Sequence, residues 1–229
     1  MKEFNNSKKR FKNAFRRILK EGDAYEIGEA ALPAYSHKNP FIDWLFWERI
    51  KVAYKLANKH KSAEKILDFG CGSGVLSYML AEKNYTVTAC DIEFGPLELV
   101  KSKIEFPTTI NFIEGDILTK NLTNNSFDII FAMDVLEHIE NLDPYINEFN
   151  RLLSPNGVIL ISGPTENIFY KFGRKMAGSR FTGDYHVTNI SIIKESFKKK
   201  MKVFSIKKLL FPVVLFELFT AQKKSLNNI

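Results

Sequence analysis

Between residues 65 and 162, short apolar runs alternate with stretches of helical pattern, and this alternation limits the possible folds more than any other feature of the sequence. The pattern predicts strands at residues 65–69, 85–90, 110–113, 127–132 and 158–162. It predicts helices at 75–83, 96–102 and 144–153, and a turn at 155–157. Strands that alternate with helices form a parallel sheet with helices on both faces. The sequence therefore predicts a doubly wound, Rossmann-like α/β fold whose ligand crevice lies at the carboxyl ends of the strands.

The last part of the chain departs from this alternation. Residues 201–210 and 213–222 are two strand-like runs that only Phe211 and Pro212 separate. So short a connection cannot hold a crossover helix, and the two strands are expected to be antiparallel. The apolar run 209–219 is too short to cross a membrane and contains Glu217, which favours a buried strand.

Two helices are expected before the first strand. Residues 41–59 have a broad apolar face, formed by Trp44, Trp47, Ile50, Val52, Tyr54 and Leu56. Residues 1–20 form a basic amphipathic helix whose apolar residues are Phe4, Phe11, Phe15, Ile18 and Leu19. Such a helix either packs on its own domain or lies on an anionic membrane. We expect an N-terminal extension over 1–40, followed by one catalytic domain over 41–224.

The net charge of +7 lies entirely within residues 1–20, because the remaining 25 basic and 25 acidic residues cancel. The neutral body argues against a nucleic-acid partner. Only two cysteines occur, which is typical of a reducing compartment. The start of the chain is charged and has no apolar signal segment. These features predict a cytoplasmic location, with peripheral membrane contact through residues 1–20 as a further hypothesis.

A glycine-rich turn follows the first predicted strand. The segment 66–74 reads ILDFGCGSG, and Asp91 and Asp116 follow the next two strands. Glycines let the backbone turn sharply and approach a ligand, and a carboxylate at the second strand end can accept both hydroxyls of a ribose. A dinucleotide site would place a further glycine where Val75 stands, and its pyrophosphate would face Asp68. The pattern favours a cationic nucleoside cofactor over a dinucleotide.

These motifs resemble the class I S-adenosylmethionine-dependent methyltransferases, in particular the ubiquinone and menaquinone biosynthesis branch. The resemblance rests on LDFGCGSG, Asp91, GDI at 115–117, FDIIFAMDVLEHI at 127–139 and LLSPNGVILIS at 152–162. It covers about residues 48–222 and implies S-adenosylmethionine as cofactor and S-adenosylhomocysteine as product. The cofactor residues that it implies are Asp68, Gly70, Cys71, Gly72, Gly74, Asp91, Ile92, Asp116, Ile117 and Met133. After Asp91 the sequence IEFGP departs from the family pattern in the loop on the adenine side.

Candidate catalytic residues are Asp134, His138 and His186. The acid-x-x-Glu-His segment formed by Asp134, Glu137 and His138 binds a divalent metal in some members of the family, but many members carry it without metal. We therefore predict no metal and keep these three residues as the alternative ligand set.

The acceptor is the least determined part of the sequence. Residues 164–188 form a lid-like insertion of mixed aromatic and basic character, and Tyr35 and His37 are candidates for an opposite wall. The resemblance implies methyl transfer to a small or lipid-like molecule, with O-methylation favoured. Two alternatives stay open, namely a non-catalytic S-adenosylmethionine-binding protein and a nicotinamide-dependent oxidoreductase.

Overall fold

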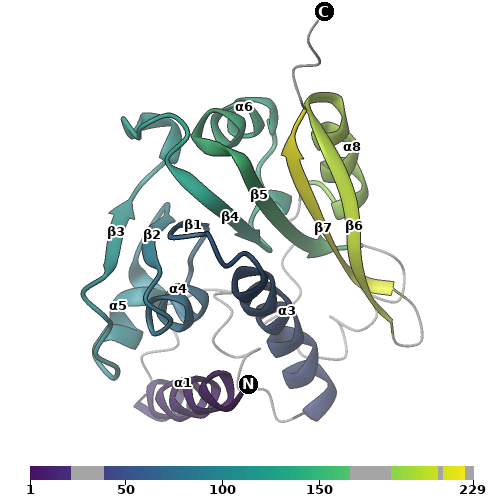
Figure 1. The fold of residues 1–229 in the computed structure, drawn as a ribbon. Coiled ribbons are helices and arrows are strands. Elements are labelled where there is room, and N and C mark those ends of the chain that lie inside the picture. Colours follow the sequence, from purple (N-terminus) through teal and green to yellow (C-terminus); the bar gives the residue numbers. More distant parts are fainter. Residues whose placement is uncertain (22–38, 166–186, 211–213, 225–229) are drawn as a thin grey trace, which may run out of the picture. The chain divides into compact units, whose positions relative to one another are not determined.

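The computed structural model describes residues 1–21, 39–165, 187–210 and 214–224 of the 229-residue chain. Its helices and strands are labelled in Figure 1, and they divide between two compact units. The first comprises Met1–Glu64 and Gly70–Ile117, and the second comprises Lys65–Phe69 and Leu118–Ile229. Each unit has its own helices, strands and buried side chains.

The first unit holds the helices α1 (Lys2–Glu21), α3 (Pro40–Lys59), α4 (Val75–Ala81) and α5 (Gly95–Lys101), with the strands β2 (Thr86–Asp91) and β3 (Ile110–Glu114). The second unit holds the strands β1 (Lys65–Phe69), β4 (Phe127–Met133), β5 (Leu153–Pro164), β6 (Met201–Leu210) and β7 (Val214–Lys223), with the helices α6 (Asp143–Leu152) and α8 (Ile190–Lys200). Two short 3₁₀ helices are η2 (Ile117–Thr119) and η3 (Leu136–His138).

In the first unit β3 lies beside β2, and in the second unit the strands follow the order β1-β4-β5-β7-β6. The pairs β2–β3, β1–β4 and β4–β5 are parallel, whereas β7 pairs antiparallel with both β5 and β6. The predicted α/β fold with a C-terminal antiparallel hairpin is therefore confirmed. β6 is the last strand of the order, and its register with β7 shifts between Ser205 and Lys207.

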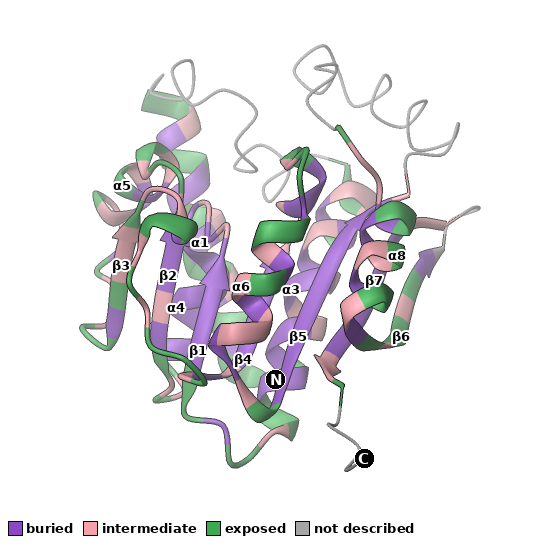
Figure 2. Ribbon diagram, turned by 90° about the horizontal axis from the view of Figure 1, so that it is seen from above, coloured by how far each residue is buried: buried purple, intermediate pink, exposed green. Residues whose placement is uncertain are grey.

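The parallel strands are apolar because both of their faces are covered. β4 is buried from Ile129 to Ala132, and β5 is buried from Gly157 onward, as the purple ribbon in Figure 2 shows. The predicted turn at 155–157 lies inside β5. Phe127 pairs with Leu153 and Ile129 pairs with Val158, so the extra residues bulge within a continuous strand.

Helix α3 begins one residue before its predicted start. Asn39 caps it by accepting a hydrogen bond from the Phe41 N–H at 2.9 Å, and Pro40 takes the first helical position. Trp47 and Tyr54 are buried as expected. The placement of Trp44 on the buried face was wrong: its side chain is 43% exposed and stacks on the ring of Phe41.

Helix α1 confirms the predicted amphipathic helix, and its apolar face is covered by its own unit. Phe4 contacts the rings of Trp47 and Tyr54 on α3, with ring centroids 6.4 and 5.4 Å apart. Phe11, Phe15 and Ile18 are fully buried. On the polar side, Lys8 and Lys12 pair with Asp43 of α3 at 3.4 and 2.7 Å. Of the two interpretations of residues 1–20, packing on the chain's own domain is the one that the structure supports.

The apolar residues of α1 are therefore not available to a membrane surface. None of the helices in the described parts of the chain combines the length and the hydropathy that a membrane crossing requires.

Candidate functional site

The loop Gly70–Gly74, here called the glycine loop, needs its three glycines for backbone geometry. Gly70, Gly72 and Gly74 have φ values of +73°, +52° and +74°, in the left-handed region that side chains disfavour. The N–H groups of Gly70 and Cys71 both donate to the carbonyl oxygen of Cys90, at 2.8 and 3.1 Å. The loop is thus fixed on the end of β2 before α4 begins.

The backbone of the glycine loop has open space beside it at Gly72. A Cβ added there would meet no heavy atom within 4 Å, so the missing side chain leaves free space beside the backbone. A ligand can approach the main chain at this position. The side chain of Cys71 is buried, and its backbone N–H is one of the groups that fix the glycine loop.

Asp91, the last residue of β2, holds the glycine loop from the side. Its Oδ2 accepts a hydrogen bond from the Gly72 N–H at 2.7 Å, and its Oδ1 accepts one from the Ile92 N–H at 2.8 Å. Burial of the carboxylate raises the pKa of Asp91, and the backbone donors of Gly72 and Ile92 act against that rise. The structure therefore holds a partly buried carboxylate by main-chain hydrogen bonds, with lone pairs left for a ligand hydroxyl.

The raised pKa of Asp91 gives a testable pH dependence. A raised carboxylate pKa means that ionisation costs more in the folded than in the unfolded chain. The stability contribution is present below the ordinary aspartate pKa and is lost as pH rises through the raised pKa. In urea denaturation between pH 3.5 and 7, we expect wild type to lose stability relative to Asp91→Asn as the pH rises. A relative gain for wild type would contradict this.

The turn after β3 supplies the third predicted group. Gly115 has a φ of +105°, and its N–H donates to the Asp91 carbonyl oxygen at 2.8 Å. This bond places Asp116 directly beyond the end of β2, on a partly exposed position. Ile117 is fully buried, whereas Ile92 is 69% exposed and presents apolar surface. In this unit, three glycine N–H groups donate to the end of β2: Gly70 to the Cys90 carbonyl oxygen, Gly72 to the Asp91 carboxylate and Gly115 to the Asp91 carbonyl oxygen.

The second unit holds the remaining predicted residues. Asp68 lies on β1 in register with Phe131 and is buried. Met133 ends β4, and Asp134 follows it with a φ of +56°, an uncommon backbone conformation for a residue other than glycine.

Ser162 of β5 fixes Asp134 in that conformation. The Ser162 Oγ donates to the Asp134 Oδ1 at 2.7 Å, and the Asp134 N–H donates to the Ser162 carbonyl oxygen at 3.1 Å. Ser162 is completely buried, and sequence reasoning did not include it in the site. Its signal was present, since it is the one polar residue in the apolar run 158–162.

The two hydrogen bonds between Ser162 and Asp134 predict an effect of Ser162 on the stability of the fold. Ser162→Ala removes the hydroxyl donor, so the Asp134 carboxylate loses a charge-assisted hydrogen bond. We expect the free energy of unfolding to fall by about 1–3 kcal/mol in chemical denaturation. Ser126→Ala is the matched control, since Ser126 bonds only a neighbouring carbonyl in an exposed turn. Equal effects of the two substitutions would argue against a special role of Ser162.

The DVLEH segment forms η3. Glu137 is buried, and its carbonyl oxygen accepts hydrogen bonds from the Val187 and Thr188 N–H groups at 2.9 and 3.3 Å. His138 is exposed. Within the described residues no group of three or more His, Cys, Asp or Glu side chains is placed to hold a metal ion, so Asp134, Glu137 and His138 do not form one.

Several predicted residues lie outside the described ranges. They are His186, Tyr35 and His37, together with the part of the lid-like insertion that covers 166–186.

Comparison with known proteins identifies related chains. Residues 67–161 match a family model described as "Methyltransferase domain", a range that contains every predicted cofactor residue. A ubiquinone biosynthesis O-methyltransferase of Haemophilus ducreyi is 33% identical over 105 residues, which cover 43% of this chain and 44% of the relative. Phosphoethanolamine N-methyltransferase 1 of Arabidopsis thaliana is 32% identical over 104 residues, which cover 44% and 21%. The chain thus spans less than half the length of these curated relatives.

Solved structures share the fold. The N-methyltransferase NodS from Bradyrhizobium japonicum, solved in complex with S-adenosyl-L-homocysteine, aligns with a TM-score of 0.62 at 16% identity. The alignment covers 82% of this chain and 90% of NodS.

Proposed function

We propose that this chain is a class I S-adenosylmethionine-dependent methyltransferase and that it transfers the methyl group of S-adenosylmethionine to a small or lipid-like acceptor. The observation that supports the proposal most strongly is the set of hydrogen bonds made by the Asp91 carboxylate. One carboxylate holds the glycine loop through Gly72 and still offers acceptor positions to a ribose.

The residues of the first unit fit the proposed cofactor. Gly72 leaves open space beside the main chain, so the amino-acid part of a ligand can lie against the glycine loop. Asp91 would accept hydrogen bonds from the ribose hydroxyls, while Asp116 and the exposed Ile92 would take the adenine. The family pattern assigns Asp68, Cys71, Ile117 and Met133 to the same cofactor, and these four assignments stay predictions.

When bound, S-adenosylmethionine supplies a methyl group activated by a positively charged sulfur. The protein then has to orient the acceptor, exclude water and take a proton where the acceptor carries one. The exposed imidazole of His138 is our candidate for that proton, and the Asp134 carboxylate, held by Ser162, is the candidate for orienting the acceptor. Catalytic roles for His138, Asp134 and His186 are part of the proposal.

We favour oxygen over nitrogen as the methylated atom. The supporting observation is that the ubiquinone biosynthesis O-methyltransferases among the relatives match the chain from several bacteria and from a yeast. The phosphoethanolamine N-methyltransferase match makes N-methylation the second candidate. Cytoplasmic location stays a prediction.

The test has two steps. Calorimetric titration with S-adenosylmethionine and S-adenosylhomocysteine, with NAD as the matched comparison, establishes the cofactor class. Transfer of labelled methyl groups to a prenylated catechol and to phosphoethanolamine then separates the two acceptor chemistries. Cofactor binding without transfer to either acceptor would favour the non-catalytic alternative, and NAD binding alone would overturn the proposal.

A further inference from the structure

The ring of Phe106 lies against the last glycine of the glycine loop. A Cβ added at Gly74 would come within 2.8 Å of the Phe106 Cε1 atom and equally close to the Leu97 Cδ1 atom. Phe106 belongs to the segment between α5 and β3 and is only partly buried. The Phe106 ring therefore fills the space that a side chain at position 74 would need.

Phe106 is itself held by α1. The buried ring of Phe11 packs edge-on against Phe106, with centroids 6.1 Å apart, and against Tyr78 of α4 at 5.1 Å. Phe106 and Tyr78 also pack edge-on at 5.4 Å. These three rings, here called the aromatic clamp, connect α1 to the middle of α4, the helix that follows the glycine loop.

A second set of bonds ties α1 to the far end of α4. The Glu82 carboxylate accepts from the Ser7 Oγ at 2.5 Å and from the Arg10 guanidinium at 3.2 Å. The Tyr78 hydroxyl donates to the same carboxylate at 3.0 Å. Helix α1 thereby packs on α4 at Tyr78 and is bonded to Glu82, the residue that follows α4.

The packing of rings continues toward Asp91. Phe106 contacts Phe112 of β3 at 5.8 Å, and Phe112 contacts Phe94 at 6.1 Å. Phe94 stands in the turn that follows Asp91, and its N–H donates to the Glu114 carboxylate at 2.9 Å. One continuous aromatic group thus touches both backbone segments of the candidate cofactor site.

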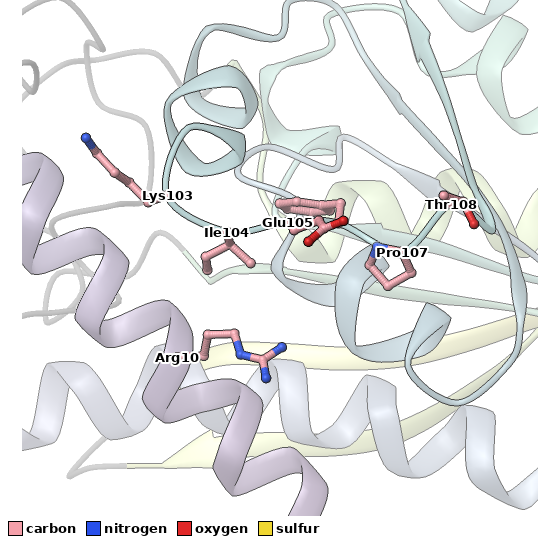
Figure 3. Close-up of a pocket in the computed structure, with 7 residues that line it drawn as sticks. Arg10, Lys103, Ile104, Glu105, Pro107 and Thr108 are labelled. Atoms are coloured by element: carbon pink, nitrogen blue, oxygen red, sulfur yellow. The ribbon is translucent and has the colours of Figure 1, made fainter.

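Phe106 also borders open space. It lines a pocket of about 620 Å³ together with Arg10 of α1 and residues 103–108 (Figure 3). The pocket shares no residue with the predicted cofactor site. Removal of the Phe11 ring would take away one of the three rings that pack on Phe106, and the pocket beside Phe106 offers space into which its ring could shift.

We propose that α1 is a positioning element of the cofactor site, in which Phe11 presses Phe106 onto Gly74 and so sets the affinity for S-adenosylmethionine. This inference rests on the proposed function, and it assigns a role to the N-terminal helix that is separate from surface binding. Phe11 and Phe106 are positioning residues, because they act through the glycine loop.

Two phenylalanines on one face of α1 provide a matched comparison. Phe4 and Phe11 are both buried, but Phe4 packs on Trp47 and Tyr54 of α3, away from the clamp. Phe11→Ala and Phe4→Ala are both expected to lower the melting temperature of the full chain. Calorimetry at a temperature where both variants are folded should show the Kd for S-adenosylhomocysteine raised about tenfold in Phe11→Ala and unchanged in Phe4→Ala.

Two further variants complete the experiment. Phe106→Ala should raise the Kd as Phe11→Ala does. In the double variant the loss of binding free energy should be smaller than the sum of the two single losses, since both changes act through the ring of Phe106. Phe11→Leu replaces Phe11→Ala if the latter does not fold. If wild type fails to bind S-adenosylhomocysteine, the proposed function is wrong. If wild type binds and the clamp variants bind equally well, or if Phe4→Ala weakens binding as much, the positioning role is overturned.

Discussion

Replacing Asp91 by alanine is expected to weaken S-adenosylmethionine binding at least a hundredfold. The substitution removes the carboxylate that would accept the ribose hydroxyls, and it also leaves the Gly72 N–H without its 2.7 Å acceptor. Hydrogen bonds to a charged group are worth about 1.5–3 kcal/mol each, and two such bonds correspond to a loss of a hundredfold or more. Calorimetric titration of both proteins with S-adenosylmethionine measures the effect.

The Asp91→Asn variant separates the two roles of the carboxylate. An asparagine keeps one acceptor oxygen for the loop but loses the charge and places an amide donor against a backbone N–H. We expect intermediate binding and a folded protein, monitored by circular dichroism. Wild-type affinity in Asp91→Ala would remove Asp91 from the cofactor site and, with it, the observation on which the proposed function rests.

Replacing Gly74 by alanine is expected to lower the free energy of unfolding by about 2–5 kcal/mol. A left-handed backbone at φ +74° costs a side chain about 1–2 kcal/mol. The new Cβ would also lie 2.8 Å from both Leu97 and Phe106, and such overpacking costs about 1–3 kcal/mol more. Chemical denaturation followed by tryptophan fluorescence measures the loss.

Gly95→Ala is the control for Gly74→Ala. A Cβ at Gly95 meets nothing within 4 Å, and Gly95 begins α5. We expect this substitution to be neutral or slightly stabilising. If Gly74→Ala is tolerated as well as Gly95→Ala, the contact between Phe106 and the glycine loop is looser than the structure has it.

Most strands and helices follow from the sequence because each has a pattern of its own. Apolar runs of five to seven residues in β1 and β4 are long enough for buried strands and too short for helices. The glycine loop could be recognised in the sequence because glycine is the residue that adopts left-handed backbone conformations most readily, and the loop has three of them. The placement of Trp44 was wrong because the apolar face of α3 is broad. Which of its outermost side chains are buried depends on the elements that pack against the helix, and the sequence pattern of the helix does not contain them.

The site was less predictable where distant residues meet. The left-handed backbone of Asp134 depends on Ser162, which is 28 residues away. The apolar pattern of α1 showed that one face would be covered but not by what, since a membrane and a set of aromatic rings select the same residues. The aromatic clamp joins α1, α4 and the segment before β3, so no single local pattern contains it.

The outer strand β6 also limits how copies of this protein can meet. A last strand presents unpaired backbone groups to which another strand can add. The exposed Phe204 and Ile206 would favour such addition. The register shift at Ser205 opposes it, since a bulge disturbs the regular ladder, and the exposed Lys202 and Lys208 place positive charge along the strand. Edge-to-edge pairing of β6 between two copies of the chain is thus opposed by the geometry of the strand and by its charge. Both features protect an edge strand with exposed apolar side chains against aggregation.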